Sequence, residues 1–362
     1  MLNRINHTVS QKFPTTYLGR GLSYGILLSV MATYSSFAAQ STSQPYEIAS
    51  NSTRVVPSTE KVIIDTDIGF DIDDAFAVAL ALRTPELEIL GFSTASGDTL
   101  ARAKIIDRML GDSGHSNIPV AVGIPTQASG ADLPDGLVGL QKRYGQSSSY
   151  ARVSHPAAVD FIAGKIRQYP GQITLVTIGP LSNVGALIER DPVTFRKLKR
   201  VVMMGGWIGP IDDDEGPHDG PKPEYNITGD IRASQLLFRS GVPLFMMPID
   251  STIELKLDEV KRKLLFSQAT PITDSLGLLY LLWGNTTPIL FDVMAVAFTT
   301  EPSLCPVTPM HIDVDDTGVT RVTDGPANVE VCLHSDPNGF LAYFMDRVIG
   351  EREGNSNLAA KE

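Results

Sequence analysis

From Lys61 onward, short runs of β-branched residues alternate with amphipathic stretches. That alternation is typical of a parallel β-sheet covered by helices. The expected strands are 61–65, 87–94, 118–122, 173–178, 201–205 and 242–247. The expected helices are 73–83, 100–110, 156–169, 182–190 and 230–240. The pattern therefore predicts an α/β protein with a single doubly wound, mostly parallel sheet and flanking helices.

The C-terminal part has a different pattern. Three short runs, 311–315, 319–323 and 329–333, predict a small antiparallel addition, and a closing helix is expected from about Asn338. The chain shows no internal repeat and no long linker, which favours one domain over 61–352 and a disordered tail over 353–362. The Asp, Gly and Pro content of loop 209–223 predicts a mobile loop at the mouth of the active site.

The first 39 residues differ in kind from the rest. They carry three basic residues and no acidic one, then an apolar run over 22–32 and a small-residue stretch that ends at Ala39. This order predicts a signal peptide over 1–39, followed by a flexible leader over 40–60. The alternative is a membrane anchor, but the apolar run is shorter than the roughly 20 residues that a spanning helix needs. We expect an exported protein, periplasmic or secreted, without stable membrane association once the signal is removed.

The composition and net charge limit the classes of molecule that the protein is expected to bind. The chain has 362 residues, 43% of them hydrophobic, and a formal net charge of −11. An acidic chain without a block of Lys and Arg is a poor nucleic-acid binder, but it is compatible with nucleosides, which carry no phosphate. Cys305 and Cys332 fit neither a disulfide framework nor a multi-cysteine zinc site. They are expected to be buried, with one optional disulfide if the compartment is oxidising.

The strongest chemical signal is the segment 62–82. Its apolar strand leads directly into five aspartates, which are Asp65, Asp67, Asp71, Asp73 and Asp74. The carboxyl ends of parallel strands carry the ligand site in α/β proteins, and unpaired carboxylates packed there repel one another unless a cation neutralises them. Oxygen ligands favour Ca²⁺ or Mg²⁺ over zinc. One aspartate, Asp71 or Asp73, is alternatively the cap of the following helix.

These residues carry a family resemblance. The run 65–69, Asp-Thr-Asp-Ile-Gly, followed by Asp73-Asp74-Ala75 resembles the N-terminal signature of the inosine-uridine preferring nucleoside hydrolases, with Asp71 as an additional residue. Four later blocks resemble the same family in the same order. They are 175–183, 201–206, 224–230 and 291–297.

The resemblance implies the nucleoside hydrolase fold and Ca²⁺-dependent hydrolysis of the N-glycosidic bond of ribonucleosides to free base and ribose. It implies that Asp67 is the general base and a metal ligand. The other implied ligands are Asp74, Asp292 and the main-chain carbonyl of Ile178. Ribose contacts are implied for Asp73, Asp98, Glu224, Asn226 and Asp292. It also implies a homo-oligomer, a dimer or a tetramer.

Two positions depart from the family pattern. Asp98 stands where many relatives have Asn, and its alternative role is the N-cap of the helix at Leu100. Phe291 stands where many relatives have the His that protonates the leaving base. His218 in loop 209–223 is a candidate substitute, although a loop histidine is more often solvated. Aromatic stacking on the base is the other option, and its candidates are Trp207, Tyr280, Trp283 and Phe291. Core packing is the alternative role for each of these rings.

Two other functions stay open from the sequence alone. An aspartate pair after an apolar strand is also found in haloacid-dehalogenase-like phosphatases, where Asp65 would be the nucleophile and Mg²⁺ the metal. That reading leaves Asp73, Asp74 and Asp292 unexplained. A catalytically inert exported nucleoside-binding protein is the second alternative, and the retained Asp67 argues against it.

Overall fold

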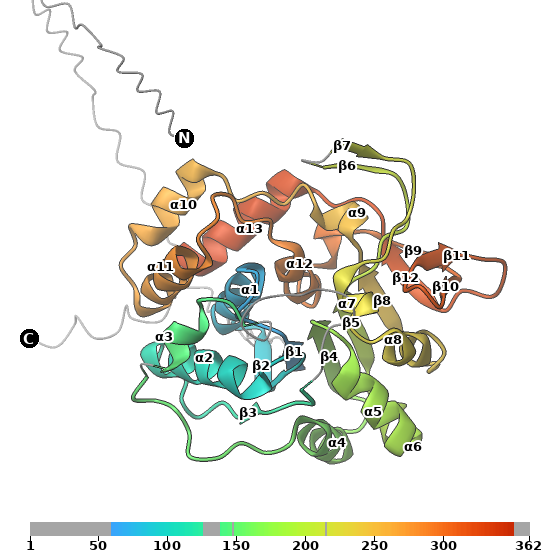
Figure 1. The fold of residues 1–362 in the computed structure, drawn as a ribbon, viewed down its shortest axis with the longest axis horizontal. Coiled ribbons are helices and arrows are strands. Elements are labelled where there is room, and N and C mark those ends of the chain that lie inside the picture. Colours follow the sequence, from blue (N-terminus) through green and yellow to red (C-terminus); the bar gives the residue numbers. More distant parts are fainter. Residues whose placement is uncertain (1–58, 126–137, 147, 214–215, 351–362) are drawn as a thin grey trace, which may run out of the picture. The chain divides into compact units, whose positions relative to one another are not determined.

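The computed structural model describes residues 59–125, 138–146, 148–213 and 216–350, all within the unit Val56–Glu362. In these residues the main sheet has eight strands (Figure 1). In spatial order they are β3 (Val120–Ala121), β2 (Leu87–Thr94), β1 (Glu60–Thr66), β4 (Ile173–Ile178), β5 (Arg200–Met204), β8 (Leu244–Met247), β12 (Val329–Cys332) and β9 (Val307–Met310). Neighbours are parallel except for β9, which is antiparallel to β12.

The order of the strands reverses at the centre of the sheet. From β1 the chain runs outward through β2 and β3, and it then returns to β4 on the other side of β1. In open α/β sheets the crevice outside the carboxyl ends of the strands at such a reversal is the usual ligand site. The topology therefore places the expected ligand site at the carboxyl ends of β1 and β4.

Helices cover both faces of the sheet. One face packs against α1 (Asp73–Leu82), α2 (Thr99–Asp112), α11 (Pro271–Trp283), α12 (Phe291–Phe298) and α13 (Pro337–Ile349). The other packs against α4 (Ala158–Gln168), α5 (Ser182–Arg190) and α8 (Ile231–Phe238). Alternation along β1 produces this division, because Val62 and Ile64 point to the first face and Ile63 to the second.

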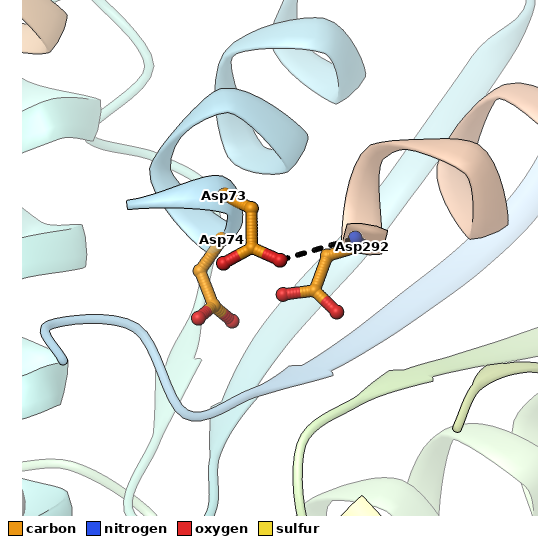
Figure 2. Close-up of side chains that lie close together, drawn as sticks. All are labelled: Asp73, Asp74 and Asp292. Carbon is orange, nitrogen blue, oxygen red and sulfur yellow. Dashed lines mark hydrogen bonds between the residues drawn. The ribbon is translucent and has the colours of Figure 1, made fainter. Parts of the chain in front are cut away.

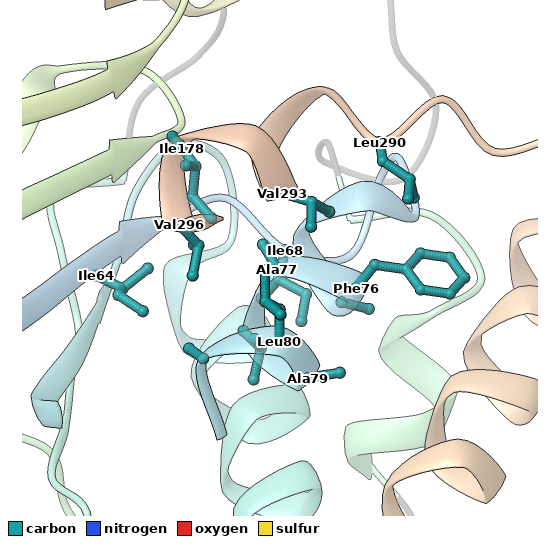
Figure 3. Packing of buried hydrophobic residues seen from close by; sticks show 14 of the residues in the cluster. Ile64, Ile68, Phe76, Ala77, Ala79, Leu80, Ile178, Leu290, Val293 and Val296 are labelled. Carbon is teal, nitrogen blue, oxygen red and sulfur yellow. The ribbon is translucent and has the colours of Figure 1, made fainter. Parts of the chain in front are cut away.

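The first face provides the apolar floor of the site. Figure 3 shows Ile68 and Ile178, which follow or end two central strands, among side chains of α1 and α12. Fully burying a large aliphatic side chain contributes about 1.5–3 kcal/mol. The amino ends of α1 and α12 are therefore held firmly beside the carboxyl ends of β1 and β4.

Short elements complete the described chain. The helices are α3 (Lys142–Gln146), α6 (Pro192–Phe195), α7 (Tyr225–Thr228), α9 (Ile249–Thr252), α10 (Glu259–Phe266) and the 3₁₀ turn η1 (Pro302–Leu304). Two antiparallel pairs lie outside the main sheet: β6 (Ile211–Asp213) with β7 (Gly216–His218), and β10 (Ile312–Val314) with β11 (Thr320–Val322). The first pair forms within loop 209–223, whose mobility stays a prediction.

The predicted doubly wound fold is confirmed, with one difference in the C-terminal part. The run 311–323 forms the antiparallel pair β10–β11, but 329–332 joins the main sheet parallel to β8. Its alternating Val residues fill the edge of the core, and β9 covers it. Strand β9 and helices α10 and α11 were not predicted.

Other expectations meet the structure only in part. The signal peptide, most of the leader and the tail lie outside the described residues. Within the described residues, no helix combines the length and the apolar character needed to span a bilayer. Cys305 and Cys332 are both buried and form a disulfide.

Candidate functional site

A cavity of about 350 Å³ opens at the carboxyl ends of the central strands. Its described lining includes six carboxylates and no Lys, Arg or His. The carboxylates are Asp67, Asp71, Asp73, Asp74, Glu224 and Asp292. Four of the five aspartates of segment 62–82, all except Asp65, therefore line one cavity together with Asp292 and Glu224.

Two helix N-termini deliver the most closely packed carboxylates. Asp73 and Asp74 occupy the first turn of α1, and Asp292 occupies the first turn of α12. Figure 2 shows the three side chains directed toward one another from these two helices. The Asp292 backbone N–H donates to Asp73 Oδ2 at 3.3 Å. A helix N-terminus favours negative charge, which helps to hold carboxylates at this position.

The electrostatics of this group fit a bound cation. Asp73, Asp74 and Asp292 are buried, and each offers an oxygen within 4.8 Å of the others. Burial, together with repulsion from neighbouring carboxylates, raises their pKa values well above the usual range. A set of oxygen-only ligands at this spacing suits a hard divalent cation, whose charge would relieve the repulsion.

Asp67 lies beside this group at the end of β1. It is buried, and burial raises its pKa while the Arg102 guanidinium opposes that shift. The backbone of β4 approaches it closely, because a Cβ on Gly179 would lie 2.8 Å from Asp67 Oδ1. Glycine is therefore required at the end of β4 for Asp67 to occupy its position.

The neighbouring polar residues fix the loop without entering the cavity. Thr66 Oγ1 donates to Asp74 Oδ1 at 2.5 Å. Asp65 does not line the cavity, since its Oδ1 accepts from Ser93 Oγ at 2.5 Å and from Asn183 Nδ2 at 2.9 Å. Its burial raises its pKa to about 6. Asp65 thus joins β1 to β2 and to α5, and it is poorly placed for the nucleophile of a phosphatase.

The predicted ribose residues Glu224 and Asn226 also reach the cavity. Glu224 is the N-cap of α7 and accepts from the backbone N–H groups of Asn226 and Ile227. It also accepts from Gly206 at 2.8 Å, which ties α7 to the turn after β5. The Asn226 side-chain amide donates to the carbonyl of Met204, so its amide orientation is fixed.

Asp98 is placed differently from the other candidates. It is the N-cap of α2, its Oδ1 accepts from Ala101 N at 3.0 Å, and it does not line the cavity. The structure therefore shows the capping alternative for this residue.

The aromatic candidates divide into two pairs. Trp207 and Phe291 line the cavity, whereas Tyr280 and Trp283 do not. The Tyr280 hydroxyl donates to the carbonyl of Thr286, and its ring packs against that of Trp283. The Trp283 side chain opposes the rise that burial causes in the pKa of Asp71, a residue of the cavity wall.

Some residues of the site were not predicted. Phe70 and Tyr225 line the cavity. The buried Arg102 does not line it but forms an ion pair with Asp67. Tyr225 stands inside the block 224–230, which was a usable signal. Arg102 lies in an amphipathic helix that gave no reason to expect a fully buried cation. His218 does not line the cavity, but its ring contacts Trp207 edge-on with centroids 5.2 Å apart.

Fold and site together define the class, an α/β protein with a candidate cation site at the sheet's topological switch point. A family model described as inosine-uridine preferring nucleoside hydrolase matches residues 62–342. The chain therefore belongs to the inosine-uridine preferring nucleoside hydrolase family.

Similar curated proteins carry related names. Uridine nucleosidase 1 of Arabidopsis thaliana is 34% identical over 212 residues, which are 57% of this chain and 61% of that protein. The chain thus matches about three fifths of this relative's length. The pyrimidine-specific ribonucleoside hydrolase RihA of Citrobacter koseri is 28% identical over 79% of this chain and 97% of that protein.

Solved structures agree on the fold. The plant nucleoside hydrolase PpNRh1 superposes with a TM-score of 0.69 at 22% identity, over 81% of this chain and 99% of that one. A purine-preferring ribonucleoside hydrolase from Gardnerella vaginalis gives a TM-score of 0.68 at 24% identity, over 80% and 98%. The predicted nucleoside hydrolase fold is confirmed.

Proposed function

We propose that this protein hydrolyses the N-glycosidic bond of ribonucleosides to free base and ribose, with a bound divalent cation. The observation that carries the proposal is the cavity, in which Asp67 lies beside the close carboxylate group and the ribose candidates Glu224 and Asn226. Membership of the family gives this arrangement its chemical meaning. The names of the relatives include both pyrimidine-specific and purine-preferring hydrolases, so we propose no base preference.

The proposed cation is Ca²⁺. Asp67, Asp74, Asp292 and the main-chain carbonyl of Ile178 would hold it, and all four residues line the cavity. A calcium ion in this position would lower the pKa of a nearby water molecule. Asp73 lies in the same close group and is assigned to the ribose hydroxyls, as is Asp292.

Asp67 is the proposed general base. The water oxygen bonds to ribose C1′, the C1′–N bond breaks with its electron pair passing to the base, and Asp67 accepts the proton from the water. The ribose passes through an oxocarbenium-like transition state, as in glycoside hydrolysis. Carboxylates around the sugar stabilise the developing positive charge.

The sugar-binding residues would select ribonucleosides over deoxyribonucleosides. Asp73, Glu224 and Asn226 present oxygens, which accept hydrogen bonds from ribose hydroxyls. A substrate that lacks a hydroxyl leaves a buried acceptor unpaired, which costs affinity in the transition state.

The leaving base would be bound by aromatic rings. Trp207 and Phe291 line the cavity, and Trp207 is fixed because its indole N–H donates to the carbonyl of Gly209. We assign base stacking to these two rings. The described lining contains no histidine to protonate the departing base.

A substrate panel tests the proposal. The protein is mixed with inosine, adenosine, guanosine, uridine and cytidine in the presence of Ca²⁺, and the released base is measured by chromatography. We expect release from at least one ribonucleoside. Binding measured by calorimetry without release would favour an inert nucleoside-binding protein. Phosphate release from phosphomonoesters without base release would favour a phosphatase.

We also propose that the protein is exported. The basic and apolar order of residues 1–39 supports this, and so does the pairing of Cys305 with Cys332, because disulfides persist in oxidising compartments. Fractionation of expressing cells checks it, with periplasmic or secreted protein cleaved near residue 39 as the expected result. We further propose a homo-oligomer, a dimer or tetramer, which light scattering coupled to size exclusion measures.

A further inference from the structure

We propose that Arg102 and Tyr225 are positioning residues that together hold the Asp67 carboxylate in one orientation through its Oδ2 atom. This inference rests on the proposed function, because it assigns the groups that aim the general base. Arg102 comes from α2, which follows β2, and Tyr225 comes from α7, which follows the β6–β7 pair.

Arg102 is fully buried beside the cavity. Its Nη2 lies 3.8 Å from Asp67 Oδ2. Its Nε donates to the carbonyl of Ser96 at 2.8 Å, and its Nη1 donates to the carbonyl of Ile68 at 2.8 Å. These carbonyls belong to the loops that follow β2 and β1. The guanidinium is therefore held by both loops, and its Nη2 forms the ion pair with Asp67.

The point at which α2 begins determines where Arg102 lies. Asp98 caps the helix, and Arg102 follows one turn later with its backbone N–H bonded to the Asp98 carbonyl. The cap fixes where α2 begins, and the next turn places the arginine under the end of β1. Among the described residues, Arg102 is the only cationic side chain that forms an ion pair with Asp67.

Tyr225 contacts the same oxygen from α7. Its hydroxyl donates to Asp67 Oδ2 at 3.3 Å, and the residue lines the cavity. Its neighbours Glu224 and Asn226 are both fixed by backbone hydrogen bonds, so the position of Tyr225 is set by the same turn.

The ion pair with Arg102 and the hydrogen bond from Tyr225 restrict the orientation of the carboxylate. Oδ2 faces Arg102 and Tyr225, while Oδ1 lies where a Cβ on Gly179 would be 2.8 Å away. Rotation of the carboxylate would break the hydrogen bond from the Tyr225 hydroxyl and weaken the ion pair with Arg102. A base held in this way is aligned before substrate arrives, so its loss should appear in the chemical step rather than in binding.

The first test is Tyr225→Phe, with Tyr144→Phe as a matched control. Tyr144 is also buried and also donates to a carboxylate, Asp112 at 3.0 Å, but it lies outside the cavity. We expect kcat of Tyr225→Phe to fall about tenfold, equivalent to about 1.4 kcal/mol, while KM and the nucleoside Kd from calorimetry change less than about twofold. The control should keep the wild-type kcat.

The second test compares Arg102→Lys with Arg102→Met, and Arg200→Lys is the control. Arg200 pairs with Glu60 at the opposite end of the sheet. The lysine should retain more kcat than the methionine at similar KM, because it restores the charge near Oδ2. Equal loss in both variants, or a rise in KM with kcat unchanged, would overturn the proposal.

Crystal structures of the variants separate this inference from the proposed function. If the wild-type protein releases no base, the proposed function fails, and the orientation of Asp67 in Tyr225→Phe then decides the inference. A rotated Asp67 carboxylate supports it. An Asp67 that keeps its wild-type orientation in Tyr225→Phe and in any folded Arg102 variant refutes it.

Discussion

The carboxylates at the two ends of strand β1 have opposite electrostatic environments. At the amino end, Glu60 accepts from Lys199 Nζ at 2.6 Å, from Arg200 Nη2 at 3.2 Å and from Thr174 Oγ1 at 2.5 Å. Burial alone would raise the pKa of Glu60, but these partners outweigh it and lower the pKa. This end is electrostatically satisfied by the protein itself.

At the carboxyl end the balance is reversed. Asp73, Asp74 and Asp292 are buried against one another, and their pKa values are raised well above the usual range. Such an arrangement destabilises the fold unless something else supplies positive charge. The protein thus pairs a carboxylate with basic side chains where it serves structure, and it groups carboxylates together where the topology places the proposed site.

The largest expected effect is at Asp67. Asp67→Asn removes the proposed base while keeping the size of the side chain, and we expect kcat/KM for the best ribonucleoside to fall about 10³-fold. The matched change at the other end, Glu60→Gln, should leave kcat/KM unchanged. Near-normal turnover of Asp67→Asn, measured as released base, would remove Asp67 from the mechanism.

The next largest effect is expected at Asp292, where one substitution should change Ca²⁺ affinity and stability in opposite directions. Asp292→Asn removes one buried charge, so Ca²⁺ affinity measured by calorimetry should fall at least about tenfold, since Ca²⁺ prefers charged oxygen ligands. In the presence of chelator the same variant should be more stable than wild type, by about 1 kcal/mol, because repulsion is relieved. A variant that is less stable than wild type in chelator would argue against repulsion within the cluster.

A smaller effect is expected at the amino end. Glu60→Gln should lower the free energy of unfolding by about 1 kcal/mol at neutral pH, since hydrogen bonds to a charged group are lost. The folded protein lowers the pKa of Glu60 below its ordinary value of 4.5, so this contribution is full above that pH and is lost as the pH falls. Denaturant unfolding of both proteins should therefore converge in acid. A difference that persists there would point to packing instead of charge.

The smallest effect is expected at Asp98, which lies at the active end but is already satisfied as a cap. Asp98→Asn keeps a good N-cap, so kcat/KM should stay within about twofold and stability within a few tenths of a kcal/mol. Steady-state kinetics with the best substrate provide the check. A large loss of activity would restore Asp98 as a substrate contact.

Much of the fold was predictable because the hydrophobic period changes clearly along the first two thirds of the chain. The strand 173–178 and the helix 182–190 have the predicted bounds. Helix α11 was not predicted, although the sequence has start signals at Thr270 and Pro271 and a stop signal at Gly284. Strand β12 was expected in a separate pair, because nothing local in 329–333 indicates which strand it will join.

The site was predictable as far as its residues are close in sequence or share a family block. The aspartates after β1 were found because they interrupt an apolar strand. Arg102 and Phe70 were not, since only tertiary packing decides that one is buried and the other lines a cavity. Likewise, no local pattern distinguishes Trp207, which lines the cavity, from Tyr280, which does not.

The most direct measurement is base release during removal and return of calcium. The purified protein is depleted of metal, depletion is verified by elemental analysis, and release of base from the best ribonucleoside is followed as Ca²⁺ is titrated back. We expect no release without metal and saturable recovery with Ca²⁺. Unchanged release from verified metal-free protein would contradict this expectation.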